Sequence, residues 1–434
     1  SKDENVFDIQ QGVSIHIFVK AKHGSSGLAE VNYYDLFGTQ KYKLDTLNKA
    51  FLDSFEWSRI TPSAPYYFFD NKDYSETATY EQGFSVADLF LEKNTGIQTK
   101  NDALTLQSSM FCIERLVEDF ILLNEREISE KYNIKSGGTW TVAAAKSDLM
   151  RRQYTLVPIL FRPFDKKYTA LTDKSSGFLG RPRFSTMHQM CNGFKNYALL
   201  VGRQNKSDTI DSFLVTDLVS EMKCAERTIQ SYHLPLYVSE TDMVSNTILP
   251  KANFSPEIVK QIEQRLGIVM DWYHYTNLNG FSALDVLDYI YAVLYSEDYR
   301  IKYKNQLKID FPRIPYPKDA DYFFGLAFYG KQLRELHLMH NEQDVSDITY
   351  ESGGSALVEA PKYKDGSIIL NKKGSKFYHV PIEIWNMGIG GYQPLQKWLK
   401  ERKGENLSAA DIEHYKQIIS ILMKTRTIVS EIKL

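Results

Sequence analysis

The spacing of apolar residues changes near residue 150. Between residues 102 and 132 the apolar side chains return at helical spacing, and acidic residues occupy the opposite face. Beyond this point come continuous apolar runs, YTLVPILFRPFD (154–165) and YALLVGRQ (197–204), which are typical of buried strands. The chain is therefore predicted to be an α+β protein in which helices dominate the first part and strands enter after a boundary at 145–155.

The sign of the charge changes at the same place. Residues 1–150 hold 22 acidic against 15 basic side chains, whereas residues 151–206 hold 11 basic side chains and only Asp165 and Asp173 as acids. A local excess of positive charge of this size is expected of a surface that meets an anionic polymer. The alternative is a solvated basic face without a partner.

A second strand pattern lies near the start of the chain. In VFDIQQGVSIHIFVK, residues 6–20, we predict two short strands around Gln10, Gln11 and Gly12, because apolar residues alternate from Val13 to Val19. A lone hairpin is only marginally stable in water. These strands are therefore expected to complete a sheet whose other strands lie upstream, and the missing initial Met agrees with a fragment.

Several classes of protein are not favoured by this sequence. No run of about 18 apolar residues predicts a membrane helix. Three scattered cysteines, Cys112, Cys191 and Cys224, fit a reducing cytoplasm better than a disulfide framework. His337 and His340 lie three apart, but no further ligand completes a recognised metal signature. We therefore expect a cytoplasmic protein without a metal site.

The glycines of NMGIGGYQPLQKWLKERKG, residues 386–404, do not have the spacing of a phosphate-binding loop. Pro394 suits the first position of a helix, where its missing N–H is harmless. We expect a structural helix with an apolar inner stripe and a basic outer face formed by Lys397, Lys400, Arg402 and Lys403.

Two polar stretches, FRPFD (161–165) and GRPRFSTMHQMCNG (180–193), carry the side chains best suited to nucleic acid. Arginine clamps phosphates and reads guanine, while asparagine and glutamine read adenine. Arg162 has an alternative as a buried structural arginine. The predicted contacts with DNA are Arg162, Lys166, Lys167, Lys174, Arg181, Arg183, His188, Asn192, Arg203, Gln204, Asn205, Lys397 and Lys400.

Several longer strings resemble the C-terminal part of type ISP restriction–modification enzymes, among them RPRFSTMHQM, IDFPRIPYPKD and IGGYQPLQKWLK. These enzymes join a nuclease, a helicase-like motor, an adenine-N6 DNA methyltransferase and a target-recognition domain in one chain. The resemblance implies the last strands of a methyltransferase-like sheet in 1–35, a helical connector in 36–150, and a mixed α/β target-recognition domain in 151–434.

The resemblance also implies a function. The chain would position double-stranded DNA for adenine-N6 methylation and cleavage by upstream methyltransferase, helicase-like and nuclease domains of the same polypeptide. S-adenosylmethionine, ATP and Mg²⁺ are expected for that parent and no cofactor or catalytic residue for this part, because the signature Asn-Pro-Pro-Tyr is absent. The alternatives are a stand-alone nuclease that uses acids of residues 1–150, or a protein-interaction module.

Overall fold

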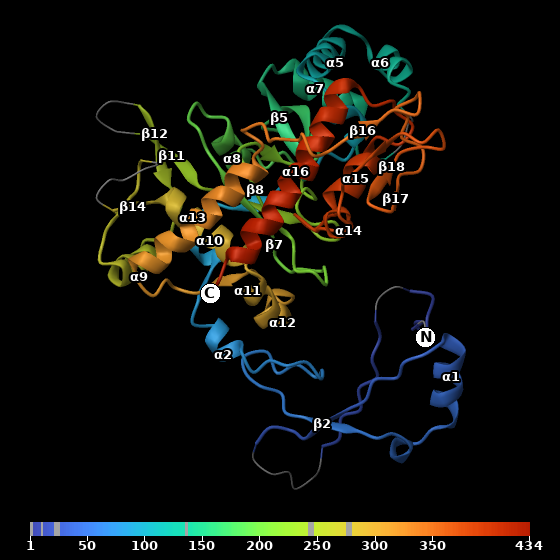
Figure 1. Cartoon of the computed structure of the whole chain (residues 1–434), viewed down its shortest axis with the longest axis vertical. Helices are drawn as coiled ribbons and strands as arrows, with labels where there is room; N and C mark the ends of the chain where they lie inside the picture. Colours follow the sequence, from blue (N-terminus) through green and yellow to red (C-terminus); the bar gives the residue numbers. More distant parts are fainter. Residues whose placement is uncertain (1–2, 10–11, 21–26, 135–137, 242–246, 275–279) are drawn as a thin grey trace. The chain divides into compact units, whose positions relative to one another are not determined.

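The computed structural model describes residues 3–9, 12–20, 27–134, 138–241, 247–274 and 280–434 (Figure 1). The chain divides into two compact units, Ser1–Ser75 and Glu76–Leu434. Residues on both sides of position 150 thus belong to one unit. The assignment of 1–35, 36–150 and 151–434 to a methyltransferase, a connector and a recognition domain stays a prediction.

The first unit is small and carries little regular structure. Its strands β1 (Val31–Tyr33) and β2 (Ser58–Ile60) pair antiparallel, and helix α1 (Gln40–Lys49) and the 3₁₀ turn η1 (Leu52–Ser54) lie between them in sequence. The Oγ1 of Thr39 accepts a hydrogen bond from the backbone N–H of Tyr42 and so satisfies one free donor at the start of α1.

The strands predicted in residues 6–20 are absent from the described part of that segment, and Gln10 and Gln11 lie outside it. The physical reason is the lack of a pairing partner, because a segment becomes a strand only when a neighbour accepts its backbone N–H groups. The alternating side chains remain in water, with Ile15 75% exposed and Val19 89% exposed. The expected methyltransferase-like sheet is therefore not seen among the described residues.

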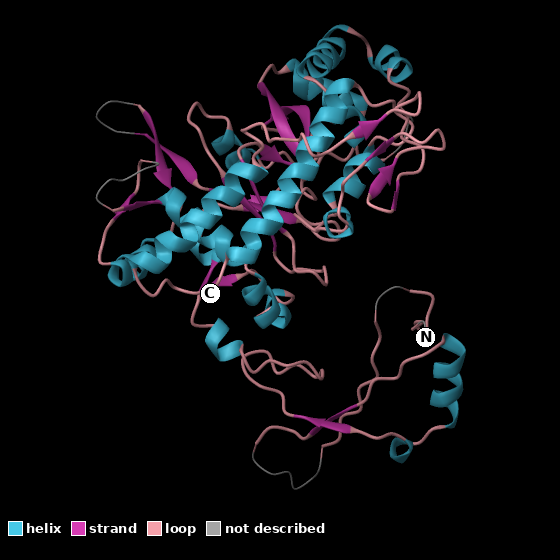
Figure 2. Ribbon diagram, in the orientation of Figure 1, coloured by secondary structure: helices cyan, strands magenta, loops and turns pink. Residues whose placement is uncertain are grey.

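The second unit contains most of the helices and strands (Figure 2). Its helices are α2 (Thr77–Tyr80), α3 (Val86–Leu89), α4 (Asp102–Thr105), α5 (Met110–Leu122), α6 (Glu125–Lys131), α7 (Val142–Met150), α8 (Phe184–Met187), α9 (Pro256–Leu266), α10 (Ala283–Tyr295), α11 (Glu297–Lys302), α12 (Lys304–Leu307), α13 (Ala320–His337), α14 (Ile382–Trp385), α15 (Pro394–Glu401) and α16 (Ala409–Glu431), with a 3₁₀ turn η2 (His188–Met190). Its strands are β3 (Phe84–Ser85), β4 (Asn94–Thr95), β5 (Tyr154–Arg162), β6 (Asp165–Thr172), β7 (Ala198–Gly202), β8 (Phe213–Thr216), β9 (Val219–Ser220), β10 (Ser231–Pro235), β11 (Tyr237–Thr241), β12 (Ile248–Ala252), β13 (Met270–Asp271), β14 (Phe281–Ser282), β15 (Arg313–Ile314), β16 (Tyr350–Glu351), β17 (Lys362–Lys364), β18 (Ser367–Ile369) and β19 (Lys376–Phe377). The predicted α+β class is confirmed.

The strands form several small sheets instead of one large one. The larger sheets have the orders β4-β10-β7-β8, β16-β19-β18-β17 and β6-β5-β9. Strand β7 is buried on both faces: Leu199 belongs to the apolar cluster around α10 and α13, whereas Leu200 belongs to the cluster around α15 and α16. This double burial explains the unbroken apolar run of residues 198–201, since side chains of a strand alternate between faces.

Apolar residues at helical spacing predict a single helix over residues 282–307 that Ser282 caps, and the helix begins as predicted but is divided. Ser282 and Asp285 form a reciprocal cap at the start of α10. At its end, Ser296 adopts an extended backbone (φ −61°, ψ 127°), and its hydroxyl accepts from the N–H of Tyr299 to start α11. Serine competes in this way with helical hydrogen bonding, which a search for apolar periodicity alone does not register.

The glycine-rich stretch starts a helix, as predicted. Gly390 (φ 57°) and Gly391 (φ 71°) take left-handed backbone conformations, and Pro394 opens α15. One detail of the expected basic face is wrong, because Arg402 turns inward. Its guanidinium binds the buried Asp165 and lies over the ring of Trp398.

Candidate nucleic-acid interface

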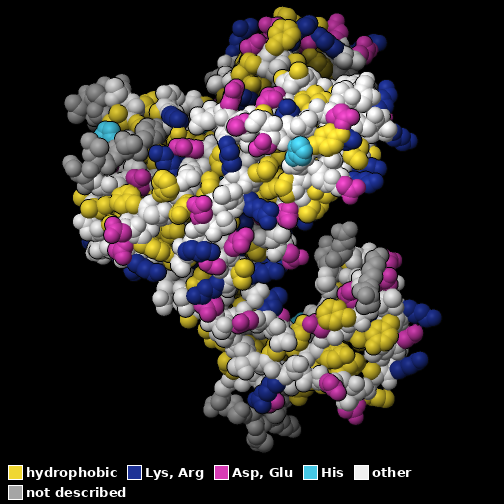
Figure 3. All heavy atoms as spheres, in the orientation of Figure 1, with side chains coloured by type: hydrophobic (Ala, Val, Ile, Leu, Met, Phe, Trp, Pro, Cys, Tyr) yellow, Lys and Arg dark blue, Asp and Glu magenta, His cyan; other side chains and the backbone are white. Residues whose placement is uncertain are grey.

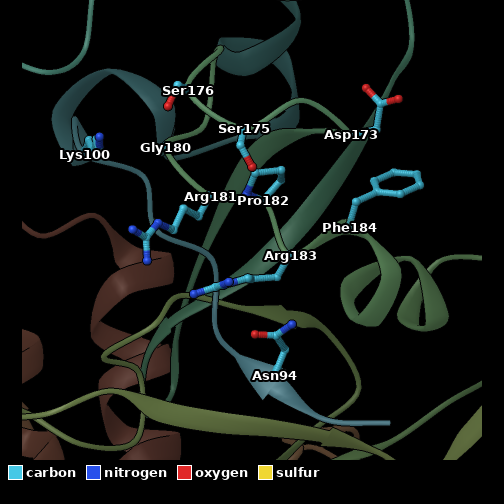
Figure 4. Close-up of a pocket in the computed structure, with 10 residues that line it drawn as sticks. All are labelled: Asn94, Lys100, Asp173, Ser175, Ser176, Gly180, Arg181, Pro182, Arg183 and Phe184. Atoms are coloured by element: carbon cyan, nitrogen blue, oxygen red, sulfur yellow. The ribbon is translucent and has the colours of Figure 1, made fainter.

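A polar pocket of about 370 Å³ opens where the loop between β6 and α8 meets the segment around β4 (Figure 4). Arg181, Arg183 and Lys100 supply its positive charge. Figure 4 shows the side chains of Arg181 and Arg183 extending toward the same side of the pocket, with the amide of Asn94 below Arg183. The remaining lining residues are Asp173, Ser175, Ser176, Gly180, Pro182 and Phe184.

The loop that carries the two arginines is anchored from behind. The carboxylate of Asp148 on α7, 1% exposed, accepts a hydrogen bond from the N–H of Phe178 at 3.0 Å. The indole Nε1 of Trp140 donates to the carbonyl of Phe178 at 2.9 Å, and the side chains of Phe178 and Leu179 are buried. Buried polar groups with satisfied hydrogen bonds hold a loop in one conformation.

A close backbone approach sets the position of Arg181. Its N–H and C=O form reciprocal hydrogen bonds with Gln98, at 2.9 and 3.0 Å. Gly180 permits this approach, because a Cβ at that position would lie 2.7 Å from Cγ of Lys100 and 2.9 Å from the carbonyl oxygen of Gln98. The glycine therefore brings Lys100 and Arg181 to the same rim.

Arg183 is held in an uncommon backbone conformation. It has φ 54° and ψ 43°, the left-handed region that non-glycine residues seldom adopt. Its carbonyl accepts from the N–H groups of Thr186 and Met187, at 3.1 and 2.9 Å, which starts α8. The Nε–H of its half-buried side chain is shielded from solvent and has no hydrogen-bond acceptor among the described residues.

The positive charge of the pocket is not neutralised by its one acidic lining residue. Asp173 binds Arg151, with distances of 2.8 and 3.2 Å between their oxygen and nitrogen atoms. This hydrogen-bonded ion pair lowers the pKa of Asp173 below its ordinary value. Within the described part of the chain, the side chains of Arg181, Arg183 and Lys100 form no ion pair. Three cationic groups are thus available to an anionic ligand.

Not every predicted contact residue reaches this pocket. Arg162 lies against Glu221 at 2.5 Å, with both side chains almost buried, and its guanidinium is 3.9 Å from the ring centroid of Phe161. These contacts agree with the alternative considered for Arg162, a buried structural arginine. Arg203 binds Asp310 at 2.8 Å on the surface.

The other predicted residues are dispersed over the second unit. Asn205 is buried, the amide of Gln204 donates to the carbonyl of Ile309, and the amide of Asn192 donates to Gln189. The ring of His188 stacks on Phe184, and Lys397 pairs with Glu401. Lys166, Lys174 and Lys400 are exposed, while Lys167 lies over the ring of Phe161.

Arg162, Arg203 and Lys397 are thus paired within the fold, and the contact of the predicted residues with DNA stays a prediction. On the side of the second unit that Figure 3 shows, Lys and Arg side chains are interspersed with Asp and Glu. Asn94 and Lys100 line the pocket but were not among the contacts predicted from the sequence. Lys100 lies some 80 positions before the arginines in an acidic part of the chain, and the bridge between Gln98 and Arg181 brings it to the pocket.

The structure contains no group of three or more potential metal ligands within the residues it describes. His337 is buried between the hydroxyls of Tyr291 and Thr425, and His340 binds Asp217 at 2.7 Å, so the two histidines have separate structural partners. None of the helices in the described ranges is long and apolar enough to cross a membrane.

Three solved structures share the fold of this chain, and each covers 93% of it. They are the type ISP enzyme LlaBIII bound to DNA (17% identity, TM-score 0.65), a nuclease-deletion mutant of the type ISP enzyme LlaGI with a DNA substrate mimic (19%, 0.62), and a DrdV–DNA complex (18%, 0.64). The fold is thus that of a portion of DNA restriction–modification enzymes. The chain spans 28%, 33% and 43% of the lengths of LlaBIII, LlaGI and DrdV, respectively.

Residues 88–431 match the family model of the type ISP C-terminal specificity domain. The chain belongs to this family, and the resemblance read from the sequence is confirmed. No curated protein sequence matches the chain at the significance required.

Proposed function

We propose that this chain recognises the DNA target of a type ISP restriction–modification enzyme, and that the Arg181–Arg183 pocket contacts the DNA. The observation that carries the proposal is the cationic pocket in a specificity-domain fold: Arg181, Arg183 and Lys100 lie together, and Arg151 occupies the neighbouring carboxylate. Phosphate contacts by such cations supply register and salt-dependent affinity, while base edges supply specificity.

The chemistry of the parent enzyme belongs to the same proposal. Methylation of adenine at N6 and cleavage would be carried out by upstream methyltransferase, helicase-like and nuclease domains, with S-adenosylmethionine, ATP and Mg²⁺ bound there. The chain itself would supply the surface that places the duplex so that one adenine can be flipped into the neighbouring catalytic pocket. No step of that chemistry is assigned to a residue of this sequence.

The exposed apolar side chains of the first unit support the presence of an adjoining domain in the same polypeptide. Ile15, Ile17 and Val19 are more than half exposed and alternate along an extended segment without a strand partner among the described residues. A segment of this kind completes a sheet supplied by another part of the polypeptide. We assign that sheet to the methyltransferase domain implied by the family.

The test is the binding of the whole chain to random duplex DNA at several salt concentrations. We expect the logarithm of the association constant to fall linearly with the logarithm of the salt concentration, and Arg181→Ala to reduce that slope by about one. The matched control is Arg126→Ala, which removes an exposed arginine paired with Glu130 on α6, outside the pocket. This variant should retain the slope of the unmodified chain.

Two results would contradict the proposal. The first is an absence of binding at about 50 mM salt, where phosphate contacts are strong. The second is a slope that Arg181→Ala and Arg126→Ala change equally, because the charge of the pocket would then have no special part in binding. Methyl transfer by the chain alone would overturn the assignment of the chemistry to the upstream domains.

A further inference from the structure

The two arginines of the pocket have different surroundings, although they lie only two residues apart. The side chain of Arg181 is exposed at the rim, next to the exposed Lys100. That of Arg183 is half-buried, and its Nε–H is shielded from solvent. Exposed, mobile cations suit phosphates, whose charge can be approached from many directions.

The Nε–H of Arg183 carries an energetic cost because it is buried without an acceptor among the described residues. A buried donor without an acceptor is unfavourable, and such groups in folded proteins require an explanation. Arg334 shows the contrast, since it places two nitrogens on Asp288 at 2.6 and 2.9 Å. Arg162 and Arg300 each keep one shielded nitrogen without an acceptor as well, but another nitrogen of each binds Glu221 and the carbonyl of Leu294, respectively. Arg183 has no such partner among the described residues, and its terminal guanidinium nitrogens, unlike the shielded Nε, are open to a ligand.

The backbone at Arg183 also favours a site of recognition over an incidental surface position. A non-glycine residue in the left-handed region is strained, and such residues cluster at ligand-binding sites. Lys100 (φ 64°) and Ser176 (φ 58°), which also line the pocket, share this conformation. The hydrogen bonds from Thr186 and Met187 to the carbonyl of Arg183 maintain this conformation. Its side chain therefore leaves the loop from a fixed point.

We propose that Arg183 is a specificity-determining residue that reads a guanine, while Arg181 and Lys100 hold phosphates beside it. This inference rests on the proposed function. A guanidinium presents neighbouring N–H groups in a rigid fork, and in the major groove guanine is the base with two adjacent acceptors, N7 and O6. The amide of Asn94 below Arg183 supplies a further polar group beside the base pair.

The experiment selects the sequences that the whole chain binds from a library of randomised duplexes, and then measures affinities for the enriched sequence and its single-base variants. The unmodified chain should enrich a guanine at one or more positions. In Arg183→Ala the preference for guanine should fall about fivefold to about 150-fold at one position and remain elsewhere. Arg183→Lys keeps the charge but loses the fork, so it should retain affinity for random DNA and lose part of that preference.

Arg181→Ala is the matched comparison, because it removes the same side chain from the same loop. It should weaken binding to all duplexes by a similar factor and leave the preferred sequence unchanged. Melting temperatures of all variants verify folding, and if Arg183→Ala fails to fold, Arg183→Lys decides the question.

The inference is overturned in either of two ways while the proposed function survives. In the first, the chain binds DNA and enriches no guanine. In the second, Arg183→Ala and Arg183→Lys weaken the binding of all duplexes equally, which would make Arg183 a phosphate contact. Failure of the unmodified chain to bind DNA at all would instead remove the proposed function itself.

Discussion

Arg402 and Asp165 join two distant parts of the second unit. The guanidinium of Arg402, directly after α15, donates to both carboxylate oxygens of Asp165 at the start of β6, at 2.9 and 3.3 Å. The side chain of Asp165 is 1% exposed, and the guanidinium also lies 3.6 Å from the ring centroid of Trp398. A cation from the last part of the chain thus neutralises an acid buried beside the strands that lead to the pocket.

Replacement of Arg402 is expected to destabilise the fold strongly. In Arg402→Ala the carboxylate of Asp165 would stay buried without its partner, which typically costs about 3–5 kcal/mol. The free energy of unfolding, measured with urea, tests this. The control is Lys400→Ala, which removes an exposed lysine of α15 two residues before Arg402 and should change stability by less than about 0.5 kcal/mol. Equal effects of the two variants would show that the ion pair contributes little.

Arg162 is expected to act through stability and not through binding. Arg162→Leu should lower the free energy of unfolding by several kcal/mol because Glu221 then remains buried and unpaired. The double variant Arg162→Leu with Glu221→Leu should recover much of the loss, since apolar side chains can replace a buried ion pair. At a temperature where the variants are folded, the salt dependence of DNA binding should equal that of the unmodified chain. A reduced slope would restore Arg162 to the contact residues.

Gly180→Ala is expected to disturb the pocket at its rim. The added Cβ would meet the carbonyl of Gln98 at 2.9 Å and the side chain of Lys100 at 2.7 Å, so the bridge between Gln98 and Arg181 must open. We expect about a tenfold loss of DNA affinity with a loss of stability of about 1–3 kcal/mol, the usual range for overpacking. Gly138→Ala is the control, because no atom lies within 4 Å of the added Cβ, although its positive φ of 96° adds strain there. Unchanged DNA affinity in Gly180→Ala would show that the rim of the pocket does not contribute to binding.

Buried histidines predict the acid sensitivity of the second unit. Burial lowers the pKa of His233 to about 3 and also lowers that of His337 to about 3. Each ring is therefore neutral in the fold but becomes protonated in the unfolded chain below its ordinary pKa of about 6.5. The unfolded state then binds more protons, so stability falls as the pH is lowered from about 6.5 toward 3.

The expected slope is up to about 1.4 kcal/mol per pH unit for each histidine. Urea unfolding at a series of pH values measures it, and His233→Asn should remove the share of one group, so that the remaining slope reports His337 and His414, whose pKa burial also lowers. His274→Asn is the control, since that ring is 75% exposed. A slope that His233→Asn leaves unchanged would refute this origin of the acid sensitivity.

Local features of the fold could be predicted from the sequence where neighbouring residues decide them. The caps at Ser282 and Ser408, the proline that opens α15, and the long helices α13 and α16 follow from interactions within one or two turns. The break at Ser296 was missed because apolar periodicity continues across it. The strands expected near Val13 are absent from the described part of that segment because strand formation depends on a partner that local sequence cannot specify.

The class of the protein follows from the order of its residues, since the strings around Arg181, Phe311 and Gly390 identify the family and the apolar patterns identify most elements. The same order also locates the segment rich in cations. Which cations remain available to DNA depends on the folded structure, because ion pairing joins residues far apart in the chain. Glu221 pairs with Arg162, and Asp310 pairs with Arg203. The same distant contacts bring Lys100 to Arg181 and leave the Nε–H of Arg183 without an acceptor among the described residues.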